Sequence, residues 1–308
     1  MINSSSLFHF TKEFGAFKQI LAEGLRFSYC YEPFGSVVAK QGLDIEIKKG
    51  SKILECKGIA IPMICFCDIP LLRTQQHRRK YGQYMIGFEK EALINLVNET
   101  EYFINPVQYR CCPLFDEQLE ILSFQKLEYI NKISIKGLPV SEIEIQQGEK
   151  RKDLLFSHLI MKPEIKEECE EEIKNINAID SVIGFSKPYK GECGYDYTAE
   201  REWRIIIPDC NRPAPNLGWI KYATKDLFED FRLSLYDNYP QEIYLQLNKD
   251  SIVSLITHIA VSNEIERKYI GHYILKRGKK VFGCNLTEKQ RLNLISKTTS
   301  FEQIEKDY

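Results

Sequence analysis

The sequence YTAEREWRIIIP, residues 197–208, decides how the rest of the chain is interpreted. Its alternating and then apolar pattern predicts a β-strand in which Glu200, Glu202 and Arg204 share one face. Two carboxylates on one strand face repel each other, which raises the pKa of at least one unless Arg204 or a ligand compensates. The pattern indicates a functional site, although a solvent-facing ladder of Glu and Arg side chains fits it equally well.

The rest of the chain predicts a mixed α+β fold. Short strands are expected at 7–10, 59–69, 83–88 and 256–261, and further extended segments at 105–109 and 241–247. Helices are expected after Thr11, over 71–82, over 89–97 and over 263–277. Residues 112–180 carry helical periodicity and a charge-rich run, and they predict a helical insertion within a single domain of residues 1–308.

Cysteine usage and apolar runs bound the class of protein. The ten cysteines include no Cys-x-x-Cys pair, and Cys65 and Cys67 lie in an apolar run, so we expect buried thiols and no metal site. No secretion signal precedes the first strand, and no apolar run approaches the ~18 residues of a membrane helix. The sequence therefore predicts a cytoplasmic protein without a membrane partner.

Missing motifs and overall charge exclude several function classes. The chain has no Walker loop, no G-x-G-x-x-G, no G-x-S-x-G and no His-Glu-x-x-His. These absences argue against an ATPase, a dinucleotide dehydrogenase, a serine hydrolase and a zincin. The formal net charge of -1 excludes a uniformly basic nucleic-acid binder.

A local basic run nevertheless lies at residues 73–80, and it includes Arg78. Such a run can hold a pyrophosphate or contact a nucleic-acid backbone, and it can equally be the solvated side of a helix. His9, between Phe8 and Phe10, poses a similar choice, since a histidine beside aromatic residues is more often a core group than a catalyst.

Six segments taken in order resemble the AbiGi-type abortive-infection family of bacterial phage-defence proteins. They are LFHFTKEFGAFKQILAEGL, IPMICFCDIPL, HRRKYGQYMIGFEKEAL, NPVQY, SKPYKG and EREWRIIIP, and they run from about Ser5 to Pro208. The family is described as the antitoxin of a two-gene system. The resemblance implies phage defence, with a neighbouring toxin–antitoxin or defence-operon protein as partner.

The opening HFT, helix, Gly-Leu is also similar to the start of ADP-ribosyltransferase-like folds. That resemblance implies a split mixed sheet and an effector that transfers ADP-ribose from NAD to a macromolecular target, with a nucleic acid as one such target. Chemically, a carboxylate can stabilise the oxocarbenium-like state that forms when the nicotinamide–ribose bond breaks. The alternative is a non-catalytic antitoxin or regulator that binds a partner toxin.

The same resemblance assigns expected roles to individual residues. Glu202 is the expected catalytic carboxylate, and Glu200 would orient or deprotonate the acceptor. NAD would be held by His9 at the ribose or carboxamide, by the ring of Tyr81 or Tyr84 against nicotinamide, and by Arg78 at the pyrophosphate.

Overall fold

The structure is a computed structural model. It describes residues 4–33, 58–110, 169–188, 197–207, 220–222, 244–245 and 247–307, together with residues 117–119, 121–122, 125–126, 128–129 and 132.

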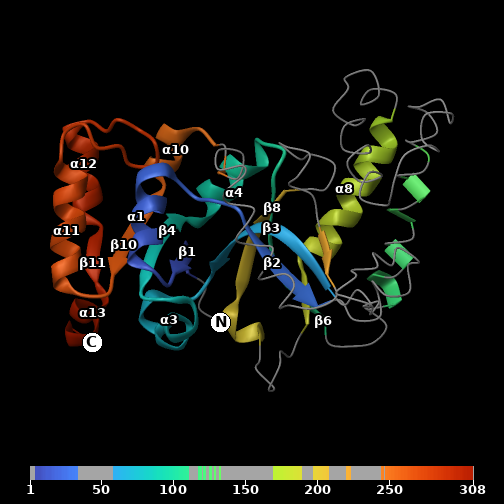
Figure 1. The fold of residues 1–308 in the computed structure, drawn as a ribbon, viewed down its shortest axis with the longest axis horizontal. Coiled ribbons are helices and arrows are strands. Elements are labelled where there is room, and N and C mark those ends of the chain that lie inside the picture. Colours follow the sequence, from blue (N-terminus) through green and yellow to red (C-terminus); the bar gives the residue numbers. More distant parts are fainter. Residues whose placement is uncertain are drawn as a thin grey trace, which may run out of the picture.

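A nine-stranded, mostly antiparallel sheet forms the centre of the fold (Figure 1). Seven strands follow the order β11-β10-β4-β1-β3-β8-β5, while β2 and β9 pair with β3 beyond that path. Among the described pairs of this sheet only β10 and β11 are parallel. The strands are β1 (Ser6–Thr11), β2 (Ser28–Pro33), β3 (Gly58–Cys67), β4 (Tyr84–Glu89), β5 (Phe103–Pro106), β8 (Glu202–Ile206), β9 (Ile220–Tyr222), β10 (Ile256–Val261) and β11 (Thr298–Ser300).

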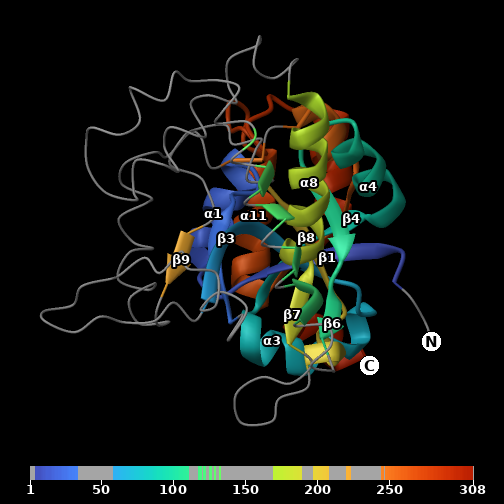
Figure 2. The ribbon, with the colours of Figure 1, turned by 90° about the vertical axis from the view of Figure 1, so that its right-hand side faces the viewer.

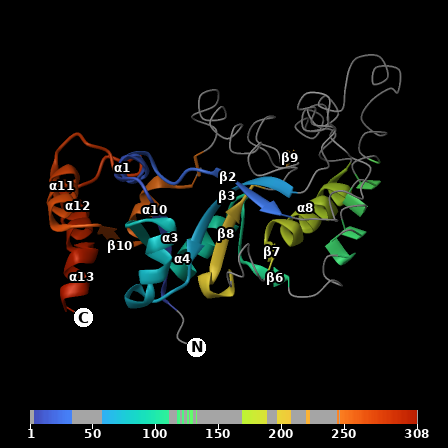
Figure 3. The same cartoon turned by 60° about the horizontal axis from the view of Figure 1, so that its bottom comes forward.

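Helices pack against both faces of this sheet (Figure 1, Figure 3). They are α1 (Phe14–Glu23), η1 (Leu71–Arg73), α3 (Gln75–Tyr81), α4 (Lys90–Asn98), α8 (Glu170–Gly184), η4 (Tyr197–Glu200), α10 (Lys249–Ser254), α11 (Glu264–Leu275), α12 (Glu288–Ser296) and α13 (Phe301–Asp307). The predicted α+β class is therefore confirmed. Because β10 and β11 join the sheet, part of the chain after residue 209 completes the same sheet as the N-terminal strands.

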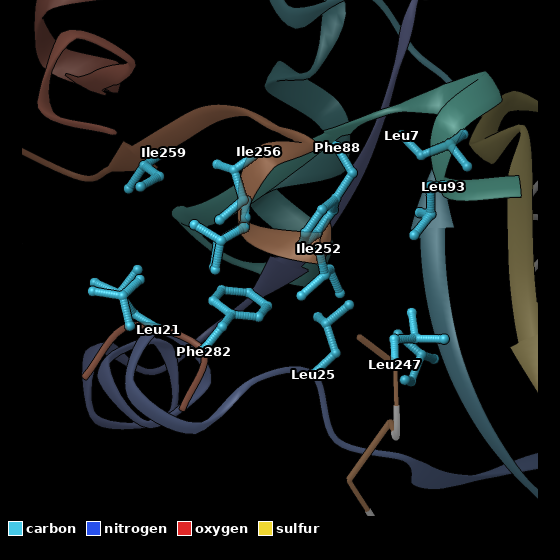
Figure 4. Close-up of a cluster of buried hydrophobic side chains, with 14 of the residues drawn as sticks. Leu7, Leu21, Leu25, Phe88, Leu93, Leu247, Ile252, Ile256, Ile259 and Phe282 are labelled. Atoms are coloured by element: carbon cyan, nitrogen blue, oxygen red, sulfur yellow. The ribbon is translucent and has the colours of Figure 1, made fainter. Parts of the chain in front are cut away.

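The larger hydrophobic core lies on what we call the first face of the sheet. Ile64, Phe66 and Phe88 of the strands meet side chains of α1, α4, α10, α11 and α12 there. Figure 4 shows the centre of this core, where Phe282 lies among leucine and isoleucine side chains. Burial of such side chains from water is the main stabilising term of the fold.

The opposite, second face carries two smaller apolar clusters. One joins Ile61 and Met63 of β3 to α8, and the other joins Phe8 and Cys67 to α13. β3 is therefore buried on both sides, which explains its nearly continuous apolar sequence. The expected buried thiol of Cys67 is confirmed by its complete burial.

The predicted strand over 197–208 needs correction. Tyr197–Glu200 forms the 3-10 helix η4, and the strand itself spans Glu202–Ile206. Between them Arg201 has φ 44°, a left-handed backbone conformation that turns the chain before β8. Glu200 consequently precedes the strand instead of sharing its face, and Pro208 lies outside the described residues.

The predicted helical insertion is flanked by a two-stranded parallel sheet. β6 (Gln108–Arg110) immediately precedes it, and β7 (Ser186–Pro188) follows it and pairs with β6. α8 runs to Gly184 and so passes the expected end of the insertion at residue 180. Residues 133–168, which include the helix predicted at 153–161 and the start of the charge-rich run at 163–174, lie outside the described residues. So does most of the strand expected over 241–247, of which Tyr244 forms an isolated bridge with Arg26.

No helix in the described ranges is long and apolar enough to cross a membrane.

Candidate functional site

Six charged side chains on the second face form one continuous ion-pair chain. Opposite charges alternate along it, in the order Glu32, Arg204, Glu202, Lys187, Glu200, Lys80. The five N···O distances in that order are 2.6, 2.7, 2.6, 2.8 and 2.6 Å. These residues come from β2, α3, β7, η4 and β8, so the ion-pair chain links β2 and α3 to three elements that follow one another late in the sequence.

Strand register places the middle of the ion-pair chain. Glu202 lies opposite Cys67 and Arg204 opposite Cys65 on β3, so both side chains emerge on the second face. They lie between its two apolar clusters, where Glu202 is 7% exposed and Arg204 is 0% exposed. Burial of such charges is tolerated only when they are paired and hydrogen-bonded.

The guanidinium of Arg204 has three hydrogen-bond partners. Its Nε donates to Glu202 Oε1, its Nη2 to Glu32 Oε1, and its Nη1 to the carbonyl of Gly184 at 2.9 Å. Gly184 ends α8, where exposed carbonyls favour a positive charge. One guanidinium thus joins β2, β8 and the end of α8.

Both carboxylates of the EREWR segment are held ionised. Burial alone would raise the pKa of Glu202, but the positive charges of Arg204 and Lys187 outweigh it and hold that pKa well below its ordinary value. The pKa of Glu200 is also lowered, because Lys187, Lys80 and Tyr81 outweigh its burial. The expected repulsion is therefore compensated, partly by Arg204 as the sequence allowed and partly by Lys187.

At the other end of the chain, Glu32 behaves differently. Burial raises its pKa, and the nearby cations of Arg204 and Lys187 only partly offset this effect. The buried amine of Lys187 has a raised pKa, because the negative charges of Glu202 and Glu32 outweigh its burial. The protein therefore stabilises the anion of Glu202 and disfavours that of Glu32.

The ion-pair chain reaches solvent at Lys80, whose side chain is 37% exposed. Beside it Tyr81 donates a short hydrogen bond to Glu200 Oε1. The ammonium groups of Lys187 and Lys80 lie 4.2 and 4.9 Å from the ring centre of Tyr197, in cation–π geometry. His77 packs against Tyr81 at 4.4 Å between ring centres, and burial lowers its pKa to about 4.

The structure does not bring His9 together with Glu202. Phe8 of β1 lies opposite Cys67, and Cys67 lies opposite Glu202, so Phe8 shares a face with Glu202. Side chains alternate along a strand, so His9 points to the first face, where its ring meets Phe66 at 5.8 Å. Its Nδ1 is 2.9 Å from the carbonyl oxygen of Cys65, and burial lowers its pKa.

Two other expected NAD contacts lie elsewhere. Tyr84 packs on the first face against Phe14 and Phe17 and donates to Glu266 of α11. Arg78 is buried and donates to Gln83 and to Glu305 of α13. Of the expected cofactor-binding residues, Tyr81 alone contacts one of the two carboxylates, that of Glu200.

The guanidinium of Arg78 also lies 4.2 Å from the ring centre of Phe301, at the start of α13. This contact and the pair with Glu305 fix α13 to α3. Within the basic run 73–80, Arg78 and Lys80 thus have internal partners, whereas Arg73 and Arg79 are exposed.

Three residues of this network were not singled out from sequence: Glu32, Lys187 and Tyr109. Lys187 belongs to the SKPYKG segment and Tyr109 to the NPVQY segment, both of which carried the family resemblance. The Tyr109 hydroxyl accepts a hydrogen bond from the backbone N–H of Glu202 at 3.2 Å. Segments that are scattered along the sequence therefore meet at the start of β8.

No cluster of three or more His, Cys, Asp or Glu side chains suited to a metal ion occurs among the residues described. The thiol of Cys65 is a poor ligand or nucleophile, because a hydrogen bond with Cys30 and burial raise its pKa well above the ordinary value. An open groove of about 590 Å³ lies beside the edge strand β5, with Trp203 and Asn177 in its lining. None of the six residues of the ion-pair chain lines this groove.

Comparison with known proteins gives the family. Residues 45–258 match the family model of the abortive phage resistance protein AbiGi, which is described as an antitoxin. The match covers more than half of the chain. The chain belongs to the AbiGi family. This AbiGi-family protein thus belongs to a family that acts in phage defence by abortive infection.

A curated relative supports the same assignment. The abortive phage resistance protein AbiGi of Lactococcus lactis subsp. cremoris is 27% identical over 256 residues, which cover 80% of this chain and 89% of the relative. No solved structure matches the fold. The ADP-ribosyltransferase-like architecture predicted from the first strand therefore gains no support from a structural relative.

Proposed function

We propose that this AbiGi-family chain works as the antitoxin or regulator of an abortive-infection pair, by binding a partner toxin without chemistry on NAD. The family description supports an antitoxin. The observation that carries the proposal is the state of Glu202, whose two carboxylate oxygens each meet a buried cation.

A carboxylate that stabilises a developing positive charge must face the substrate with its own charge uncompensated. Glu202 is instead buried between Arg204 and Lys187, and its charge is already balanced inside the protein. Glu200 is likewise held by Lys187, Lys80 and Tyr81. Both carboxylates therefore stabilise the junction of five elements, which is the role we assign to them.

The placement of His9 supports the same proposal. A site for NAD would need His9 and Glu202 within reach of one ribose, and the register of β1, β3 and β8 directs them to opposite faces. A small dinucleotide cannot contact both through a packed sheet. Binding of a protein partner has no such requirement.

Co-expression with the neighbouring toxin gene tests the proposal. We expect the wild-type chain to restore growth and to co-purify with the toxin. His9→Gln removes the expected NAD ligand, and we expect it to restore growth equally well. Tyr84→Phe, which loses only the contact with Glu266, serves as the matched control for disturbance of the first face.

An assay for transfer of labelled ADP-ribose completes the test. We expect no transfer from NAD by the wild-type chain, with or without the toxin. Transfer that disappears in His9→Gln, together with growth arrest caused by this chain alone, would contradict the proposal and favour the ADP-ribosyltransferase alternative.

A further inference from the structure

A strongly basic surface lies at the C-terminal end of α11, away from the ion-pair chain. Residues 267–280, RKYIGHYILKRGKK, contain six Lys or Arg and no Asp or Glu, although the whole chain has a net charge of -1. Figure 1 shows α11 and α12 at one extreme of the molecule, and Figure 2 shows the sheet from the side of α8. We call residues 276–280 the basic turn.

Four of these cations stand on the basic turn itself. Lys276, Arg277, Lys279 and Lys280 are all exposed, and none is paired with a carboxylate of the described residues. Lys268, about two helical turns before Lys276 on α11, is exposed as well. By contrast Arg267 pairs with Glu264 at 2.7 Å, so the uncompensated charge begins after it.

The backbone of the basic turn is held in place by hydrogen bonds from neighbouring side chains. Arg291 of α12 is buried and donates to the carbonyls of Leu286 at 3.2 Å and Lys279 at 2.9 Å, and also to Ile274. The hydroxyl of Tyr273 donates to the carbonyl of Lys280 at 2.9 Å. A turn held in this way presents its side chains without first paying an ordering cost on binding.

The positive φ of Gly278, 81°, sets the direction of the chain within the turn. A Cβ at this position would meet no atom within 4 Å, so the surface above the turn is open. The residues on either side of Gly278 therefore project their charges into solvent on a rigid scaffold.

The C-terminal dipole of α11 accounts for part of this charge, because cations are favoured within the last turn of a helix. It does not account for Lys279 and Lys280, which lie beyond that turn. A protein partner is also a poor match, since protein–protein interfaces are depleted in lysine. Closely spaced cations of one sign suit a row of phosphates instead.

We propose that the basic turn and the outer face of α11 bind the phosphodiester backbone of a nucleic acid. Lys268, His272 and Lys276 follow one another at four-residue spacing and continue the turn along the helix. Tyr269, which is 50% exposed beside this stripe, contacts Phe14 and Lys18 with part of its ring, and the exposed part is available to an unstacked base. This proposal does not depend on the proposed function.

Binding of a 20-base-pair DNA duplex and of a single-stranded RNA of 20 nucleotides, each measured over a series of salt concentrations, tests the proposal. We expect the wild-type chain to bind at least one of them with an affinity that falls as salt rises. Replacing Arg277, Lys279 and Lys280 by Gln removes three phosphate contacts, and we expect the slope of log K against log salt to become shallower by about 2 to 3.

A matched control replaces Lys12, Arg73 and Arg79 by Gln. These three cations are also exposed, and their loss changes the net charge by the same amount. We expect the control to keep the affinity and the salt slope of the wild-type chain, and both variants to melt within a few degrees of it. Equal loss in the two triple variants would show that total charge alone drives binding and would overturn the proposal.

Three further outcomes overturn the proposal. One is no binding of either nucleic acid by the wild-type chain at 50 mM salt. Another is loss of binding in the control triple variant alone, which would place the binding site at the basic run 73–80. The last is binding to vesicles of phosphatidylserine and phosphatidylcholine without binding to DNA or RNA, which would assign the turn to a lipid surface.

Discussion

The ion-pair chain and the basic turn are both dense in charge, but they differ in sign and in partners. In the ion-pair chain three carboxylates alternate with three cations, and the central members are buried. In the basic turn all four charges are positive and exposed. Charge balanced inside the protein is used to hold elements together, whereas charge left unbalanced at the surface is available to another molecule.

Loss of Arg204 should reduce the free energy of unfolding most. Arg204→Met leaves Glu202 and Glu32 buried without their main cation, and removing one partner of a buried pair typically costs about 3 to 5 kcal/mol. We expect the free energy of unfolding, measured by urea titration, to fall by that amount. Arg204→Lys should recover only part of the loss, because an ammonium cannot reproduce the planar contacts to two carboxylates and a carbonyl.

Acid should destabilise the protein through His77 by a smaller amount. Burial lowers the pKa of His77 from 6.5 to about 4, so the folded state binds fewer protons than the unfolded state between these values. Stability should therefore decrease as the pH falls from 6.5 to 4, by about 2 to 3 kcal/mol from this group.

His77→Gln should flatten that part of the stability curve, whereas His272→Gln, on the exposed side of α11, should leave it unchanged. The lowered pKa values of Glu200 and Glu202 act at lower pH. Their stabilising contribution is complete above about 4.5 and is lost as the pH falls through their folded-state values. Identical curves of unfolding free energy against pH for wild type and His77→Gln would show that His77 does not cause the loss of stability between pH 6.5 and 4.

Substitution at the weak end of the ion-pair chain should cost less. Glu32→Gln keeps an acceptor for Arg204 and removes a carboxylate whose pKa burial has already raised. We expect a loss of about 1 kcal/mol, well below that of Arg204→Met, in the same urea titration. A loss as large as that of Arg204→Met would show that Glu32 contributes as much to stability as the centre of the ion-pair chain does.

The basic turn should contribute least to stability. Its cations have no carboxylate partners in the described part of the chain, so the triple Gln variant of Arg277, Lys279 and Lys280 should unfold within about 0.5 kcal/mol of wild type. Calorimetry checks this value. A larger loss would mean that these side chains hold the end of α11, and it would weaken their assignment to a partner.

Local pattern predicted much of this fold but little of its long-range pairing. Alternation correctly placed Glu202 and Arg204 on one strand face, and the apolar run around Ile64 correctly predicted a buried strand. The left-handed Arg201 was not foreseeable from alternation, and it moved Glu200 off the strand. Lys80 reaches Glu200 across 120 residues of sequence, a separation at which periodicity carries no information.

The expected convergence of His9 and Glu202 depended on register as well. Side chains alternate between the two faces within each strand. Only the alignment of β1 with β3 and of β3 with β8 determines whether the side chains of His9 and Glu202 lie on the same face. The basic turn shows the opposite case. Its lysines are visible in the sequence, whereas their exposure and the support from Arg291 required the fold.

The unfolding free energy of Glu202→Gln tests the central claim most directly, since a structural and a catalytic carboxylate predict opposite results. In this account Lys187 and Arg204 lose the carboxylate between them, and the variant should be destabilised by about 3 kcal/mol. Catalytic carboxylates held unpaired for a substrate cost stability, so their replacement leaves stability unchanged or raises it. A Glu202→Gln protein that is as stable as wild type but has lost phage protection would contradict the account.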